Sequence, residues 1–358
     1  MNEIIRLNAE TKNMWEEYVK NNPDSGIQHS LKFMQVLKES YSNCEEYYFL
    51  YKKDNIRALF PFVLVKSKIF GDRLICIPFL DVGGFLGLYD SKILNNLIKT
   101  MTKDIKNIRH IEVRLNTSLE NFDKTRKILL ETGFKEEKNK YQFIIPLTSK
   151  EDMWERFHKH TRNDIRKAQK SGLKIEKIDN KEELKRFYGL YSKEMRNFGT
   201  PQHSYKFFEK LFDILGSDFI GFNCYYQGDI AGSLIAYNYN NHAYISFNVS
   251  NPKFRDYRPN DFLYWTAITL LMERGVKNID MGQVEKDSPA GSHAHGLYKF
   301  KAKWLGELHE RLYFYLSEEN GETKEDKNRY KRFRNIWKHL PLFVIKKIGP
   351  KICSELGT

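Results

Sequence analysis

Hydrophobic periodicity divides the first 148 residues into alternating helices and strands. Met14, Trp15 and Tyr18 share one face of a 3.6-residue period, and Pro23 follows the predicted end of that helix. Residues 47–51 and 56–65 read as the two strands of a hairpin. The predicted helices are 11–21, 30–38, 93–106 and 124–132, and the further predicted strands are 74–77, 110–115 and 141–146.

The second half of the chain repeats this order of elements. It predicts helices over 151–170, 181–196 and 259–273, and strands over 219–226, 230–237, 243–249 and 278–281. The second hairpin turn corresponds to the first in position and in part of its sequence. The chain is therefore expected to hold an α/β unit twice, as domains 1–148 and 149–317, followed by a linker and tail over 318–358.

The tail is basic and amphipathic. From Lys327 to Ser354 it contains nine Lys or Arg residues, no Asp or Glu, and ten large apolar residues. This composition is typical of a helix lying in an anionic membrane interface, so residues 328–352 are predicted to contact such a surface. Two alternatives stay open: a helix docked on the protein's own body, or one that contacts RNA.

The net charge indicates which kind of partner the protein binds, and the cysteine content indicates the cell compartment. The 358 residues carry a net charge of +13, which favours an anionic partner. Four well-separated cysteines without a Cys-x-x-Cys pair indicate a reducing compartment. The polar N-terminus lacks the features of a signal peptide, and no apolar run approaches ~20 residues. A cytoplasmic protein, peripheral at the inner membrane face, is expected.

Residues 292–306 are the most promising chemical stretch. They follow the predicted strand 278–281, and a glycine-rich turn would deliver Phe300, Lys301 and Trp304 to the end of a sheet. A lysine there can stabilise the oxygen charge that develops in acyl transfer. By residue type alone, core aromatics with solvated lysines are the more frequent arrangement.

Other motifs are less specific. Arg162 and Arg166 share one face of a predicted helix and could grip a phosphate or carboxylate, although a solvated basic face is as frequent. His158 and His160 would point apart on a helix, and His293 with His295 lacks a nearby acidic or Cys ligand. No metal site is predicted, and motifs for a nucleophilic serine or a nucleotide phosphate loop are lacking.

Four motifs in order along the chain resemble the FemAB-type transferases, and specifically the branch associated with exosortase and exopolysaccharide gene clusters. That family is built from two GNAT (acetyltransferase-like) domains in tandem, each a mixed, mostly antiparallel sheet flanked by helices. The motifs are Phe70 to Gly84, Thr161 to Gly172, Asp280-Met-Gly with Tyr298 to Gly306, and Trp337 to Pro350.

The resemblance implies site residues. The family's Phe-Lys pair falls on Phe300 and Lys301, so Lys301 inherits stabilisation of the tetrahedral intermediate. Tyr205 falls near a substrate-channel tyrosine, and Lys38 near a phosphate-contacting lysine. Pro201 replaces an arginine of the muropeptide-binding members, and the usual Gly-Arg-Ser run is Gly282-Gln-Val here.

The expected function is transfer of an acyl or aminoacyl group to an amine of an anionic cell-envelope precursor. No cofactor is expected to be bound, and aminoacyl-tRNA or acyl-CoA would be the co-substrate. Asp280 is the candidate for orienting the amine or taking its proton, with His295 a further candidate. The alternatives are N-acylation of an amino sugar from acyl-CoA or acyl carrier protein, and an inactive double-GNAT module that binds RNA or anionic glycolipid. The sequence does not fix the oligomeric state.

Overall fold

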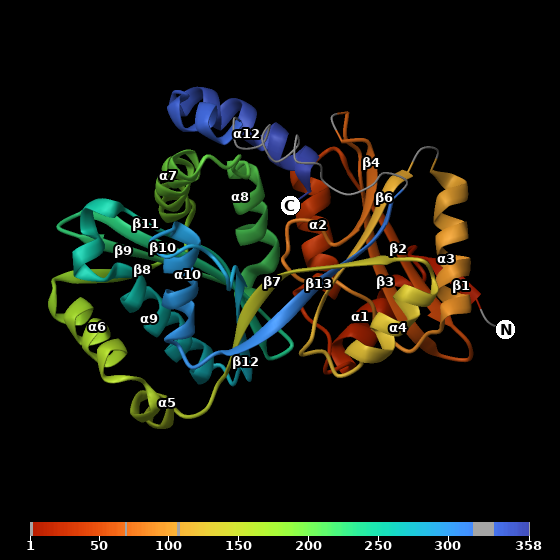
Figure 1. Cartoon of the computed structure of the whole chain (residues 1–358), viewed down its shortest axis with the longest axis horizontal. Helices are drawn as coiled ribbons and strands as arrows, with labels where there is room; N and C mark the ends of the chain where they lie inside the picture. The colour runs from red at the N-terminus through yellow and green to blue at the C-terminus, as the bar shows by residue number, and fades with distance from the viewer. Residues whose placement is uncertain (1–2, 69, 106–107, 318–332, 358) are drawn as a thin grey trace. The chain divides into compact units, whose positions relative to one another are not determined.

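The computed structural model describes residues 3–68, 70–105, 108–317 and 333–357 (Figure 1). The described chain forms two compact units. The first holds residues 3–140, 309–317 and 352–357, and the second holds 141–308 and 333–351. Both units combine a mixed sheet with flanking helices, which is the predicted α/β class.

The first unit contains one sheet with the strand order β1-β2-β3-β4-β6-β13, and β5 pairs with β3. Only β4 and β6 run parallel among these pairs. Its strands are β1 (Glu3–Arg6), β2 (Cys44–Lys52), β3 (Ile56–Val65), β4 (Asp72–Cys76), β5 (Leu86–Gly87), β6 (Ile108–Asn116) and the greater part of β13 (Glu307–Ser317). Its helices are α1 (Lys12–Asn21), α2 (Leu31–Ser40), α3 (Ser91–Asp104) and α4 (Phe122–Glu131).

The second unit repeats this plan with the strand order β7-β12-β11-β10-β9-β8, in which only β11 and β12 run parallel. Its strands are β7 (Lys135–Pro146, entering from the first unit), β8 (Leu173–Lys177), β9 (Phe219–Tyr226), β10 (Asp229–Tyr239), β11 (His242–Ser250) and β12 (Asn278–Val284). Its helices are α5 (Lys150–Arg156), α6 (Lys159–Lys170), α7 (Lys181–Phe198), α8 (Tyr205–Leu215), α9 (Pro259–Glu273), α10 (His293–Ala302) and most of α12 (Leu342–Leu356).

Local sequence explains where several helices begin. The hydroxyl or amide oxygens of Ser30, Asn180, Ser204 and Ser292 accept backbone N–H bonds at the starts of α2, α7, α8 and α10. Gly199 ends α7 in the left-handed conformation, with φ of +74°. These caps satisfy N–H and C=O groups that a helix cannot pair internally.

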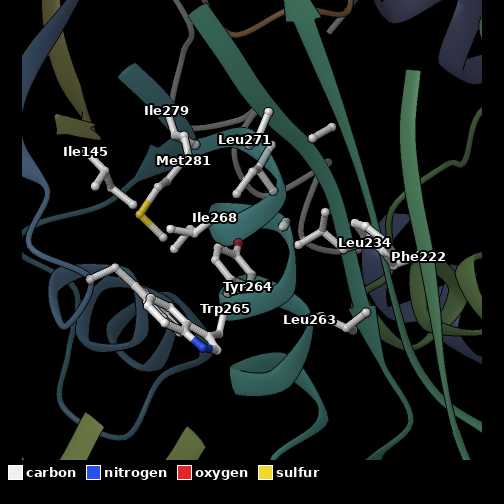
Figure 2. Packing of buried hydrophobic residues seen from close by; sticks show 14 of the residues in the cluster. Ile145, Phe222, Leu234, Leu263, Tyr264, Trp265, Ile268, Leu271, Ile279 and Met281 are labelled. Atoms are coloured by element: carbon white, nitrogen blue, oxygen red, sulfur yellow. The ribbon is translucent and has the colours of Figure 1, made fainter. Parts of the chain in front are cut away.

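The core of the second unit is organised around α9. This helix is apolar on most of its circumference, which is typical of a buried helix. Figure 2 shows Tyr264, Ile268 and Leu271 of α9 between Met281 on one side and Leu234 on the other. Because α9 packs against β8, β9, β10 and β11, it holds these strands in place relative to one another.

Two predicted elements are wrong. The predicted helix 151–170 is two helices, because Phe157 takes an extended conformation (ψ 137°) and His158 begins α6 as its N-cap. The predicted glycine-rich turn at the start of 292–306 is helical instead, since Ser292 caps α10 and Gly296 lies inside it. The pattern also left α8, β8 and β13 unpredicted.

Among the helices of the described residues, none combines the length and the apolar character needed to cross a bilayer. The predicted basic tail is helical at residues 333–339 and in α12, while residues 328–332 lie outside the described part of the chain.

Candidate active site

The parallel strands β11 and β12 form the framework of the candidate site. Their pairing runs from His242↔Asn278 to Tyr244↔Asp280. Immediately afterwards, the register of β12 against β7 shifts between Asp280 and Gln283. Gly282 supplies the required positive φ of +74°, and its N–H donates to Oδ1 of Asp280 at 2.7 Å. The strand β12 therefore contains a β-bulge where its parallel pairing with β11 ends.

Lys301 lies beside this bulge. It projects from α10, its side chain is almost fully buried, and its Nζ donates to the carbonyl of Gln283 in β12 at 3.1 Å. Phe300 packs edge-on against Tyr264, with ring centroids 4.9 Å apart. The packing of α10 on α9 thus holds an ammonium group beside the bulged end of β12.

Lys303 is not solvated as its residue type suggests. Its Nζ contacts the carboxylates of Asp261 and Asp164, and Arg258 also pairs with Asp164 at 3.3 Å. Asp261 is buried, and that burial raises the pKa of its carboxyl although Lys303 opposes the shift. This ion cluster ties α6, α9 and the end of α10 together. Sequence reasoning missed it because the two acids lie 42 and 139 residues from Lys303.

The two arginines of α6 have local structural partners. Arg162 Nη1 donates to the carbonyls of Glu155 at 3.0 Å and of Trp154 at 3.3 Å, at the end of α5. The guanidinium of Arg166 lies 5.3 Å from the ring centroid of Trp154. Both side chains therefore hold the α5–α6 turn, and their predicted grip on a substrate anion stays a prediction.

The remaining predicted residues lie on several elements. Tyr205 opens α8 and its hydroxyl donates to the carbonyl of Lys181 at 3.5 Å. His295 lies in the first turn of α10, where its backbone N–H donates to the Ser292 hydroxyl at 3.2 Å. Lys38 is exposed on α2 of the first unit. Asp280, His295, Phe300 and Lys301 thus share the neighbouring elements β12 and α10.

Histidine geometry differs from the prediction for a continuous helix. Because His158 precedes α6 as its N-cap, its ring stacks on that of His160 with centroids 5.1 Å apart. His293 packs on Phe198, and burial with Arg255 and Arg334 nearby lowers the pKa of its imidazole. Within the described ranges, no three His, Cys, Asp or Glu side chains are grouped to hold a metal ion.

Comparisons with known proteins agree with this geometry. Residues 155–301 match the acetyltransferase (GNAT) domain family, a segment that runs from α5 through Lys301. The FemX crystal structure aligns with 93% of this chain and 100% of its own, at a TM-score of 0.70 and 16% identity. A 70-residue segment is 30% identical to the lipid II:glycine glycyltransferase of Staphylococcus aureus. The chain thus contains a match to the GNAT domain family, and its likenesses to FemX and to the glycyltransferase agree with the predicted FemAB-type resemblance.

These likenesses cover different shares of the chain. The segment shared with the glycyltransferase covers 20% of this chain and 17% of that enzyme. A tandem GNAT protein from the clavulanic acid biosynthesis pathway aligns with 90% of this chain and all of its own, at a TM-score of 0.59 and 10% identity. These structural likenesses confirm the fold of two GNAT-like domains in tandem, while the narrower exosortase-associated branch stays a prediction.

Proposed function

We propose that the second unit catalyses acyl transfer, and specifically that it joins an aminoacyl group to an amine of an anionic cell-envelope precursor. The observation that carries this proposal is the buried Lys301 ammonium beside the bulged end of β12. The match to the GNAT domain family over residues 155–301 supports the acyltransferase class. The name of the lipid II:glycine glycyltransferase, which shares a 70-residue segment with this chain, supports an envelope acceptor.

In the proposed reaction, the acceptor amine attacks the carbonyl carbon of the donor's ester. A C–N bond forms, and the carbonyl oxygen carries negative charge in the tetrahedral intermediate. Lys301 stabilises that oxyanion, because a preorganised cation in a water-poor site lowers the barrier without having to reorient. Collapse of the intermediate breaks the C–O bond. The nitrogen loses a proton, and the leaving oxygen takes one up.

Asp280 is the proposed acceptor of the amine proton. Its carboxylate also accepts the Gly282 N–H, so a second role in shaping the strand end must be separated from catalysis. Asp280→Asn keeps an oxygen that can accept this bond but removes the basic group. A hundredfold or larger fall in kcat, with unchanged thermal stability, would support the proton-transfer role. Unchanged kcat would assign Asp280 to the strand end alone.

Two segments of the second unit lack the features of a loop that binds the pyrophosphate of acyl-CoA, and this favours aminoacyl-tRNA as the donor. GNAT enzymes that use acetyl-CoA cradle its pyrophosphate with a glycine-containing loop before a helix, where backbone N–H groups are free to bind. The segment between β11 and α9 contains no glycine, and α9 carries the buried Asp261 carboxylate in its first turn. The nearest motif, Arg196 to Gly199, is instead the C-terminal end of α7.

Phe300, Arg162, Arg166, Tyr205, His295 and Lys38 are the proposed substrate contacts. The reaction is proposed to occur in the cytoplasm at the inner membrane face, where an envelope precursor would be presented. Pro201 stands where an arginine occurs in muropeptide-binding members, so a lipid-linked precursor is favoured over a nucleotide-linked muropeptide.

The full-length protein should be incubated with charged tRNA or acetyl-CoA, and with nucleotide-linked or lipid-linked envelope precursors. Mass spectrometry is expected to detect an aminoacyl addition to a precursor only when charged tRNA is present. Transfer from acetyl-CoA to an amino sugar would favour the alternative N-acyltransferase. Tight binding of RNA or glycolipid without any transfer would instead establish an inactive binding module.

A further inference from the structure

The basic tail docks on the second unit through one face. Trp337 and Ile345 are fully buried, and Arg334 Nη2 donates to the Phe198 carbonyl at the end of α7, at 3.0 Å. Gly199 permits this approach, since a Cβ there would lie 2.7 Å from the Arg334 carbonyl oxygen. These contacts define which face of the tail helices points toward the protein.

A second close approach holds the middle of α12 against the second unit. A Cβ on Gly349 would lie 2.5 Å from Oε1 of the buried Gln202, in the loop before α8. The Lys346 ammonium lies 5.8 Å from the ring centroid of Tyr188 on α7. Figure 1 shows α12 running past α7 and α8, consistent with these contacts. Docking on the protein's own body, one of the alternatives left open by the sequence, is therefore observed for this face.

The opposite face combines large apolar side chains with lysines. Phe343 is 76% exposed and Ile336 is 64% exposed, and Ile348 is also exposed. The exposed lysines of this segment are Lys338, Lys346, Lys347 and Lys351. Phe343, Lys347 and Lys351 follow one another at intervals of four, so they form a single stripe along α12. We call this stripe, together with Ile336, Lys338 and Ile348, the outer tail face.

We propose that the outer tail face binds the surface of an anionic lipid bilayer. Lysines attract anionic headgroups, and apolar side chains beside them gain free energy by entering the boundary between headgroups and acyl chains. No Asp or Glu lies between Lys327 and Ser354 to oppose that attraction. Docking and membrane binding thus use opposite faces of the same segment.

The apolar members of the face distinguish a bilayer from RNA. A phosphate backbone is bound by cations, and bases are bound by stacking on aromatic rings. Ile336 and Ile348 have no such stacking surface, and their exposure to water is unfavourable unless an apolar phase receives them. The outer tail face therefore fits a shallow interfacial contact in which the lysines remain at headgroup level.

The test is co-sedimentation of the full-length protein with phosphatidylglycerol-containing vesicles and with phosphatidylcholine vesicles at several salt concentrations. Binding is expected to the anionic vesicles and to weaken as salt rises. Lys338→Gln with Lys347→Gln and Lys351→Gln should weaken it on the order of a hundredfold, about fivefold for each lysine. The charge-matched control replaces Lys92, Lys99 and Lys103, which are exposed on α3, and should bind as the wild type does.

A second variant tests the apolar part. Phe343→Ser with Ile348→Ser should weaken vesicle binding tenfold or more. Leu130→Ser, at an exposed apolar position on α4, should leave it unchanged. Circular dichroism and the melting temperature check that each variant is folded.

Three outcomes would overturn the proposal: equal binding to both vesicle types, wild-type binding by both tail variants, or binding to a single-stranded RNA alone. None of them bears on acyl transfer, because sedimentation requires no donor or acceptor.

Discussion

The two units share a topology but end their parallel strand pairs differently. In the first unit, the loop after β4 returns to the sheet: the Gly83 N–H donates to the Arg114 carbonyl in β6 at 3.1 Å. Cys76 and Gly84 are also hydrogen bonded through the thiol. In the second unit, the corresponding end of β12 receives the ammonium of Lys301. In the first unit, main-chain hydrogen bonds and Arg114, which is paired with Glu112, close the strand end, whereas in the second unit Lys301 borders it.

This difference shows why the fold alone does not assign the chemistry. The end of a strand can be closed by hydrogen bonds that only stabilise the fold, or it can present a side chain that takes part in catalysis. The residues at that end decide which of the two applies. The charged groups of the first unit illustrate the structural case, since Arg114 is buried and paired with Glu112. We therefore expect substitutions in the first unit to change stability or binding, and those at Lys301 to change the rate of transfer.

The largest stability effect is expected at Lys303. Lys303→Met leaves the buried Asp261 carboxylate without its main cation, which should lower the free energy of unfolding by about 3–5 kcal/mol at neutral pH. Urea unfolding measures the loss, and Lys299→Met, at an exposed position on the same helix, is the control.

The same variant has a predicted pH dependence. Burial already raises the pKa of Asp261, and removal of Lys303 should raise it further. Since protonation removes the unpaired charge, the defect should shrink as pH falls through that raised pKa. A loss below 1 kcal/mol, or one independent of pH, would show that the cluster is not structural.

Glu112 should give the next largest effect. Burial acts to raise the pKa of its carboxyl, but Arg114 and His110 together hold it at about 2, below the ordinary value of 4.5. A lowered folded pKa stabilises the protein above pH 4.5, and that stabilisation is lost as pH falls toward 2. Glu112→Gln should cost about 3 kcal/mol at pH 7 and remove this acid-dependent loss. Its kcat, measured per folded molecule, should not change.

Gly83 tests the closed strand end directly. A Cβ at this position would lie 2.0 Å from the Cys76 carbonyl oxygen, so Gly83→Ala must displace the loop. We expect a loss of about 1–3 kcal/mol in the free energy of unfolding. Gly189→Ala is the control, because nothing lies within 4 Å of its added Cβ and alanine favours the α7 helix. Equal stability of the two variants would contradict the closure.

The smallest effect is expected at Lys38. If this exposed residue only contacts a substrate phosphate, Lys38→Ala should raise KM about fivefold and leave kcat unchanged. Lys32→Ala, exposed on the same helix, should have wild-type kinetics. A fall in kcat for Lys38→Ala would show that the first unit takes part in the chemical step, and would contradict the difference in role between the two units.

Local signals predicted much of the fold. The hairpins and α1 follow from periodicity, and α9 follows from a nearly continuous apolar segment. The break at Phe157 was not predicted, since neither glycine nor proline marks it and packing decides the conformation there. The helix α10 was hidden by Gly291 and Gly296, which resemble turn residues.

Residues of the candidate site could be predicted from the sequence only where they belong to a family motif. Phe300 and Lys301 were assigned through the family resemblance, and composition alone favoured solvated lysines. The hydrogen bond from Lys301 to Gln283 and the pairing of Lys303 with Asp261 depend on tertiary contacts between distant segments. Such contacts have no sequence periodicity, so the structure was needed to distinguish the two lysines.

The most direct measurement is the transfer rate of Lys301→Ala beside Lys299→Ala, an exposed position on the same helix. The oxyanion role predicts that Lys301→Ala loses about 10²–10³-fold in kcat, while its melting temperature stays close to that of the wild type. Lys299→Ala should keep full activity. A folded Lys301→Ala protein with wild-type kcat would contradict the placement of the chemistry in the second unit.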